Sequence, residues 1–237
     1  MAHPSQSLTK AAVRFGAALI CLTFFTADVQ AQGDRWTVLM DAAAAAHQRG
    51  DIDEAERRLG LALGVAEEIA ADDPRVAETL AALGSLYYER NRFAEAATLL
   101  DRALAIDHKS LPPNDTKTAV HLTAQGLVRA QLGDFDAAAV HHGHALAIYR
   151  ETLGADHPRV TTAMESLAGV YLMAGRYAEA APHYARVLER VEVKLGAVHP
   201  DLVPILDSYA LALRNLDRDY EASALEARAD AIRTGSD

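Results

Sequence analysis

Residues 175–180 read GRYAEA, and closely similar strings occupy 133–138 (GDFDAA), 91–96 (NRFAEA) and 50–55 (GDIDEA). A degraded fifth copy, DRDYEA, occupies 217–222. The alanines that end the five strings lie 41, 42, 42 and 42 residues apart. Strings that recur at a fixed spacing along a chain indicate stacked copies of one structural unit. We therefore expect one unit used five times.

Small residues keep the same spacing at two further positions of the unit. About a fifth of the chain is alanine, the best helix former, whereas 8 prolines and 14 glycines are too few for a loop-rich chain. Small side chains at fixed positions are what two antiparallel helices need where they cross most closely. Each unit is therefore predicted to be a pair of amphipathic helices that buries its apolar stripes only by stacking on its neighbours. These positions are Ala43, Gly84, Gly126, Ala168 and Ala210, and Ala62, Ala103, Ala145, Val187 and Ala229.

This 42-residue pattern resembles the tetratricopeptide repeat, in the longer form found in kinesin light chain and in many bacterial repeat proteins. Residues 156–160 (DHPRV) and 198–202 (VHPDL) resemble the family's DHPDV junction between units, and Leu-Gly precedes each junction. The resemblance covers roughly residues 35–233. It implies an all-α fold, a right-handed superhelical solenoid of about five helix–turn–helix units. The expected units lie at about 35–75, 76–117, 118–159, 160–201 and 202–233.

The junctions also indicate how the first helix of each unit begins. Asp73 and Asp115 directly precede a first helix, where a carboxylate can cap the free backbone amides. His157 and His199 recur at the junctions 42 residues apart, which favours a structural ladder over a catalytic pair. Pro204 is expected to delay the start of the first helix in the fifth unit, or to bend that helix.

The amino terminus has the pattern of a secretory signal peptide, residues 1–31. Lys10 and Arg14 precede an apolar run at 15–25, and Val29-Gln30-Ala31 fits a cleavage site after Ala31. The alternative is an uncleaved anchor, but the run is about a dozen residues and a spanning helix needs roughly 20. We therefore expect a periplasmic or secreted protein with no stable membrane insertion after cleavage. Cleavage would also remove the single cysteine, and with it any disulfide or cysteine-ligated zinc.

The charge balance and the missing motifs exclude several classes of function. The chain carries 33 acidic residues against 23 Lys and Arg, a net charge of −10, which argues against nucleic acid as a main partner. It contains no G-x-S-x-G, no phosphate-binding glycine loop and no His-Glu-x-x-His. We therefore expect no enzymatic activity and no cofactor.

Ten histidines nevertheless raise the question of a metal site. The weak candidates are His141 and His144, three residues apart on a predicted helix, with His183 as the equivalent of His141 one unit later. No cysteine or suitably spaced carboxylate accompanies them. His142 occupies a helix-contact position and His144 an exposed one. We therefore predict no metal site.

The resemblance implies that one face of each first helix lines a concave groove that binds a protein or peptide. This face is apolar in the middle and acidic at several positions, so a segment with apolar anchors and a Lys or Arg would suit it. The same acidic residues could equally belong to ordinary solvated helix faces. The family's paired asparagines, which clamp a peptide backbone, are absent. The predicted groove residues are Met40, His47, Glu78, Ser85, Tyr88, Glu89, Thr123, Gln131, Glu165, Leu172, Asp207 and Arg214, with Val120, Leu127, Gly169, Met173, Pro204 and Leu211 on the same face.

Together these features predict an exported, non-enzymatic scaffold that binds a partner protein or peptide in its groove. Two alternatives stay open. The chain could be a self-associating spacer of the cell envelope, or an accessory protein that binds metal through its histidines.

Overall fold

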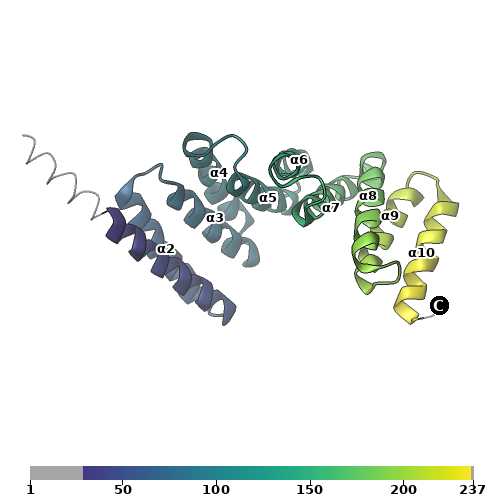
Figure 1. The fold of residues 1–237 in the computed structure, drawn as a ribbon, viewed down its shortest axis with the longest axis horizontal. Coiled ribbons are helices and arrows are strands. Elements are labelled where there is room, and N and C mark those ends of the chain that lie inside the picture. The colour runs from purple at the N-terminus through teal and green to yellow at the C-terminus, as the bar shows by residue number, and fades with distance from the viewer. Residues whose placement is uncertain (1–28, 236–237) are drawn as a thin grey trace, which may run out of the picture. The chain divides into compact units, whose positions relative to one another are not determined.

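Helices joined by short turns make up the part of the chain that the structure, a computed structural model, describes, which is residues 29–235. The predicted all-α solenoid of consecutive helix pairs is confirmed (Figure 1). Residues 1–28 of the predicted signal peptide lie outside the described residues, and residues 29–31 belong to the first helix. In order, the helices are residues 29–48, α2 (Ile52–Ile69), α3 (Pro74–Glu89), α4 (Phe93–Ser110), α5 (Thr116–Gln131), α6 (Phe135–Leu153), α7 (Pro158–Met173), α8 (Tyr177–Leu195), the 3-10 turn η1 (Pro200–Leu202), α9 (Val203–Arg214) and α10 (Asp219–Thr234).

The turn inside each helix pair has a left-handed residue at the position that opens the repeated string. Its backbone φ is +78° at Gly50, +58° at Asn91, +78° at Gly133, +71° at Gly175 and +58° at Asp217. Glycine adopts this conformation without steric cost, and Asn and Asp tolerate it better than other residues. The short string therefore works as a helix–turn–helix signal, because it reverses the chain at the same point in every unit.

The small residues of the repeat lie where helices cross. Every one of them is buried, from Ala43 to Ala229. The crossing is closest at Gly126, where an added Cβ would come within 2.6 Å of the Nε2 atom of His142. At the equivalent Gly84, an added Cβ would lie 2.8 Å from the Cγ atom of Leu100. A larger residue at either position would clash with the large side chain opposite it, so these two positions require glycine.

The described chain divides into two compact units, whose boundary falls within α3. In the first unit, residues 29–83, the chain's only tryptophan joins the first helix to α3. The Trp36 Nε1–H donates to the Thr79 hydroxyl at 2.8 Å, and that hydroxyl donates to the Arg75 carbonyl at 2.7 Å. Thr79 is fully buried, so this pair satisfies a polar group inside the core.

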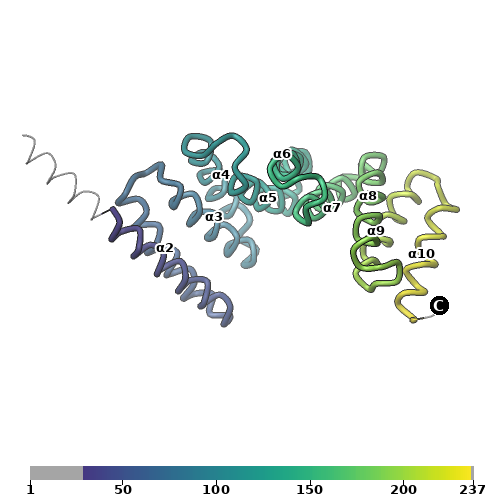
Figure 2. The backbone as a smooth tube through the Cα atoms, in the orientation of Figure 1, coloured from purple at the N-terminus to yellow at the C-terminus, as the bar shows by residue number. Residues whose placement is uncertain are grey.

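The second unit, residues 84–235, is a run of helices in which each packs on the next, from α4 to α10 (Figure 2). Its core is continuous and includes fully buried Val160, Val187 and Leu206. As predicted from Pro204, the first helix of the final repeat starts late, because the 3-10 turn η1 precedes α9, which begins at Val203.

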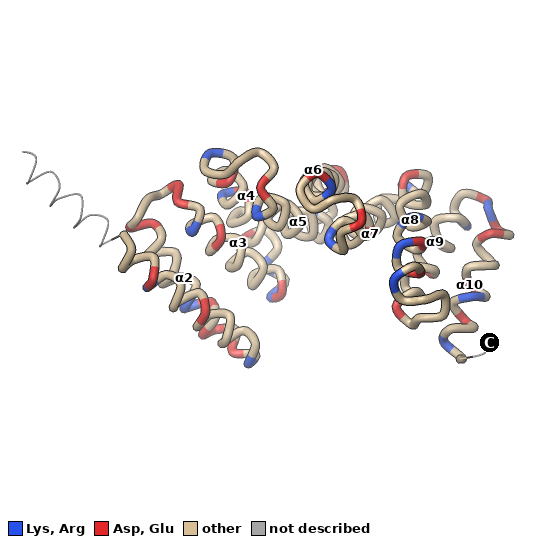
Figure 3. Tube along the Cα trace, viewed as in Figure 1, with Lys and Arg blue, Asp and Glu red and all other residues tan. Residues whose placement is uncertain are grey.

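The last helix, α10, is polar on the side away from α9, and Ala222 and Ala229 are its buried residues. It carries acidic residues along its length and arginines in its second half (Figure 3). Its Glu226 accepts from the Arg214 guanidinium of α9 at 2.9 Å (Nε to Oε1), and its Arg233 pairs with Asp207 of α9. Ion pairs with α9 therefore accompany the packing of Ala222 and Ala229 in this helix pair.

A side chain caps the start of α3, α5 and α7, and of the 3-10 turn η1 that precedes α9. A side-chain acceptor takes the backbone N–H two residues later at Asp73 (2.9 Å), Asp115 (2.8 Å), His157 (3.2 Å) and His199 (3.2 Å). These four residues are spaced by 42. The two junction histidines therefore cap helices through Nδ1, which is a structural role.

The variant H157D should raise the free energy of unfolding by about 0.5–1 kcal/mol at pH 7, because a carboxylate caps better than an imidazole and suits the positive helix end. It copies Asp73, whose carboxylate also binds the Arg75 side chain at 2.8 Å, and Arg159 holds the position of Arg75. Urea unfolding measures the change, with H157A as the uncapped control. Equal stability of the H157D and H157A variants would contradict this capping role.

Candidate functional site

Most of the predicted groove residues of the second unit come from α5, α7 and α9, where the repeat places them at equivalent positions of the helix surface. We call this surface the first-helix face. Its apolar members Val120, Leu127, Met173 and Leu211 are 41–55% exposed, as are apolar residues elsewhere on the chain such as Leu61 and Val140. It consists of Val120, Thr123, Leu127 and Gln131 on α5, Thr162, Glu165, Gly169 and Met173 on α7, and Pro204, Asp207, Leu211 and Arg214 on α9.

Two of the predicted groove residues from neighbouring first helices meet. The Gln131 side-chain amide on α5 donates to the Tyr88 hydroxyl on α3 at 3.4 Å, and the Tyr88 ring packs edge-on against Phe93 at 5.5 Å. The Thr123 hydroxyl instead bonds its own helix, at the Ala119 carbonyl. Leu172 is half-buried against the core, whereas Ser85 and Glu89 are exposed.

In the first unit, Met40 and Glu78 are half-buried and His47 is exposed. The Met40 sulfur lies 3.7 Å from the Thr79 hydroxyl oxygen, whose proton goes to the Arg75 carbonyl at 2.7 Å. Met40 therefore contacts the core through its sulfur.

The charged members of the first-helix face differ in what they contact. Asp207 pairs with Arg233, and Arg214 binds Glu226 and Asp219 of α10. Both charges are thus neutralised within the last helix pair. Glu165 forms no hydrogen bond or ion pair among the described residues, and burial raises the pKa of its carboxyl above the usual range.

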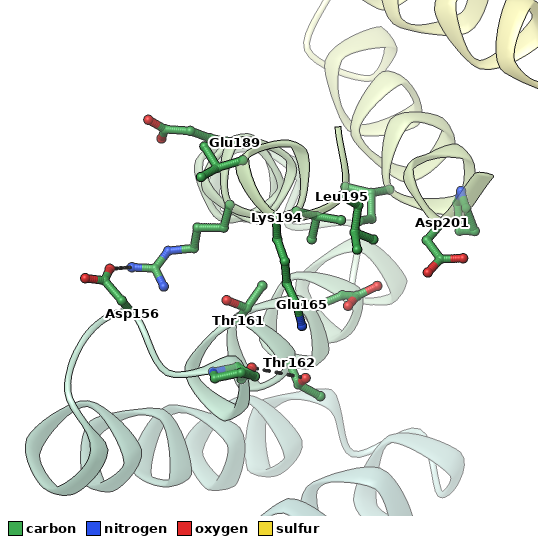
Figure 4. A pocket seen from close by; sticks show the side chains of 14 residues that line it. Asp156, Thr161, Thr162, Glu165, Glu189, Lys194, Leu195 and Asp201 are labelled. Carbon is green, nitrogen blue, oxygen red and sulfur yellow. Dashed lines mark hydrogen bonds and ion pairs between the residues drawn. The ribbon is translucent and has the colours of Figure 1, made fainter. Parts of the chain in front are cut away.

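A hollow of about 840 Å³ lies beside Glu165, between the first half of α7, the end of α8 and the start of α9 (Figure 4). Its wall combines apolar side chains with charged ones from three helices. Arg190 of α8 crosses one end and binds the Asp156 carboxylate at 3.4 Å. The lining residues are Asp156, Pro158, Thr161, Thr162, Glu165, Glu189, Arg190, Val191, Val193, Lys194, Leu195, Asp201, Pro204 and Ile205.

The weak metal candidates are not brought together as a ligand set. The described residues hold no group of three or more His, Cys, Asp or Glu side chains placed to bind a metal ion. His144 is exposed, and the His183 ring stacks on Tyr171 with centroids 5.9 Å apart. Burial lowers the pKa of both His141 and His183.

Sequence reasoning missed a polar core in the middle of the second unit. The His121 Nδ1 atom lies 2.7 Å from the Asp107 Oδ2 atom, with both side chains buried. Gln125 is fully buried and donates to the Asp101 carboxylate at 2.5 Å. The signal was present: in the neighbouring units the Asp107 position holds alanine or tyrosine, and the His121 position holds threonine or alanine.

No helix in the part of the chain that the structure describes has the length and apolar character needed to cross a membrane.

The geometry defines a helical-repeat protein in which paired antiparallel helices stack in register with the sequence repeat. A family model described as Tetratricopeptide repeat matches residues 36–109 and 117–192, more than half of the chain. The chain therefore belongs to the tetratricopeptide repeat family.

Several solved structures share this fold. BtubC (BKLC) from P. vanneervenii is 24% identical over 87% of this chain and 82% of its own, with a TM-score of 0.73. The nearly identical TPR-like repeats of a kinesin light chain-like protein from Podosopora anserina are 22% identical over 85% of this chain and 96% of their own, also at 0.73. The MamA protein is 20% identical over 85% and 93%, at 0.61. These likenesses show the fold alone. The comparison with curated proteins found no match.

Proposed function

We propose that this chain is an exported, non-enzymatic scaffold that binds a segment of a partner protein along the first-helix face. The observation that carries the proposal is the row of exposed apolar side chains on α5, α7 and α9, which the repeat places on equivalent helix faces. Tetratricopeptide repeat proteins are generally scaffolds without catalysis and commonly bind proteins or peptides. Repeat arrays use such extended surfaces for binding.

Export is proposed from the sequence of residues 1–31 alone, through its positive start, apolar run and Val29-Gln30-Ala31 site. A periplasmic or secreted location would present the first-helix face to envelope or extracellular proteins. The self-association alternative has no comparable support, because the outer side of α10 is polar and charged.

The test is crosslinked capture of partners by the full chain in its own cells. The double variant L127E/L211E should lose the captured partner, with at least tenfold less recovered, because it places two charges on the apolar row. The matched control is L61E/V140E, which adds the same charges at equally exposed apolar positions on the second helices α2 and α6. N-terminal sequencing of the recovered chain should read Gln32 as its first residue.

Equal recovery with L127E/L211E and L61E/V140E would exclude the first-helix face as the binding surface. A chain recovered with Met1 intact would exclude cleaved export while leaving the binding proposal open to its own test.

A further inference from the structure

We propose that the hollow between α7, α8 and α9 is the subsite for a lysine or arginine side chain of the bound partner segment. This inference rests on the proposed function, because it names the chemistry that one part of the first-helix face selects. The occupant is an extended, basic peptide segment.

The first argument is the state of Glu165. Of the three charged residues on the first-helix face, Asp207 and Arg214 already have partners in α10, and Glu165 has none. Its carboxylate projects at the rim of the hollow, which the Asp201 side chain from η1 also lines (Figure 4). A carboxylate that is partly withdrawn from water and unpaired gains most from an incoming cation.

The second argument is the charge balance of the lining. Arg190 and Asp156 neutralise each other, and the Glu189 carboxylate points away from the hollow, which leaves Glu165 and Asp201 against Lys194 (Figure 4). Among the described residues, Asp201 has an ionisable contact with the His199 Nδ1 atom at 3.7 Å. That nitrogen also accepts the Asp201 backbone N–H at 3.2 Å. The hollow is therefore net negative, as is the whole chain at −10.

The third argument comes from the chain's own lysine. Lys194 leaves the end of α8 and extends its side chain into the hollow toward α7 (Figure 4). It lies beyond ion-pair distance of Glu165 and binds no other described group. A lysine side chain thus fits this space, while the resident one is too far from the carboxylate to satisfy it. A partner's lysine or arginine could displace this exposed, flexible side chain and reach Glu165.

The remaining wall suits the aliphatic part of such a guest. Val191, Leu195 and Ile205 line the hollow next to the charged groups. The methylenes of lysine and arginine bury against apolar surface while the charged end stays at a polar site.

The spacing to the apolar row predicts the form of the partner segment. Pro204 lines the hollow and Leu211 is exposed on the same helix, seven residues on, about 10 Å at the helical rise. An extended chain advances about 3.3 Å per residue. The segment should therefore carry a large apolar residue about three positions from its lysine or arginine.

The test selects random octapeptides, displayed on phage, that bind the full chain. Peptides that bind the E165Q variant equally well are discarded. Peptides that carry Lys or Arg about three positions from a large apolar residue should be enriched. A synthetic peptide of the consensus should bind E165Q about tenfold more weakly than the native chain, and K194A about threefold more tightly. E189Q is the matched control, because its carboxylate points away from the hollow (Figure 4), and it should change affinity less than twofold.

Enrichment of acidic peptides, or of free carboxyl ends that depend on Lys194, would overturn the proposal in favour of an anion subsite. Selection of no E165Q-sensitive peptide would overturn it as well. If binding depends on Leu127 and Leu211 but not on Glu165, the subsite fails while the proposed function stands. If E165Q-sensitive peptides bind but L127E/L211E keeps its cellular partner, the proposed function fails and the subsite stands.

Discussion

Replacing His121 with isoleucine should lower the free energy of unfolding by about 3 kcal/mol, even though isoleucine is the more apolar residue. Asp107 is 1% exposed, and His121 is the partner of its Oδ2 atom at 2.7 Å. The Asp107 Oδ1 atom already has no hydrogen-bond partner. The variant would leave a buried carboxylate with neither oxygen satisfied, and such an uncompensated charge costs about 3–5 kcal/mol.

The double variant D107V/H121I should recover most of that loss and unfold within about 1 kcal/mol of the native chain. It copies the equivalent pair two repeats later, where Val191 and Ile205 are also 14 residues apart. Replacing both members of a buried polar pair by apolar residues of suitable volume is often neutral or stabilising.

Urea unfolding of the native chain, D107V, H121I and the double variant at pH 7 forms a double-mutant cycle. We expect a coupling energy of about 2 kcal/mol or more, because each single variant leaves the other polar group buried without a partner. Simple additivity of the two single changes would show that the pair is not a buried interaction in solution.

The helix pairs were predictable because their signals are local and periodic. The residue that opens each string, Gly133 for example, sets a left-handed turn, and the small residues recur at the helix crossings. Each signal depends on one residue and its spacing, so the sequence alone carries it. The same periodicity placed Leu127 and Leu211 on an exposed helix face.

What the periodicity could not provide is the pairing of side chains across helices. Asp207 and Arg214, which the periodicity places on the predicted groove, pair with Arg233 and Glu226 of α10. These pairs depend on how far an arginine side chain extends from another helix, and the spacing of residues along the sequence does not predict that distance. The hollow beside Glu165 has the same origin, because three separate helices and a 3-10 turn supply its wall.

The polar core escaped prediction for a different reason. The periodicity rests on the small residues at the helix crossings, whereas Asp107 and His121 occupy large buried positions. At those positions most other units hold apolar or small residues, so the two polar residues stand out only against every buried position of the five units.

His142 should make the protein lose stability as the pH falls from 6.5 toward 4. The side chain is fully buried against Gly126, and neither ring nitrogen has a hydrogen-bond partner. Burial lowers the pKa of His142 to about 4 from its ordinary value of 6.5, and the neighbouring His141 adds to this. The folded chain therefore resists the proton that the unfolded chain accepts.

The direction of the effect follows from proton uptake. Above pH 6.5 neither state carries the proton, and the stability is complete. Between pH 6.5 and pH 4 the unfolded state binds it and the folded state does not, so the free energy of unfolding falls by about 1.4 kcal/mol per pH unit. From pH 6.5 to pH 5 the loss should be about 2 kcal/mol. Carboxylates whose pKa is lowered, such as Asp73 and Glu226, begin to contribute only at lower pH.

The variant H142L should remove most of this slope and raise the stability at pH 7 by about 1–2 kcal/mol, because it deletes two unsatisfied buried polar atoms. Leucine fits, since Leu100 packs against Gly84 at the equivalent crossing. A smaller dependence of the free energy of unfolding on pH should remain in the variant, because burial also lowers the pKa of His141 and His183. The reverse variant L100H should carry the acid sensitivity into the preceding helix pair. The measurement is the urea midpoint of unfolding at pH 7.5, 6.5, 5.5 and 5.0. Parallel pH profiles for the native chain and H142L would contradict the prediction, because His142 would then take up its proton as readily in the folded state as in the unfolded chain.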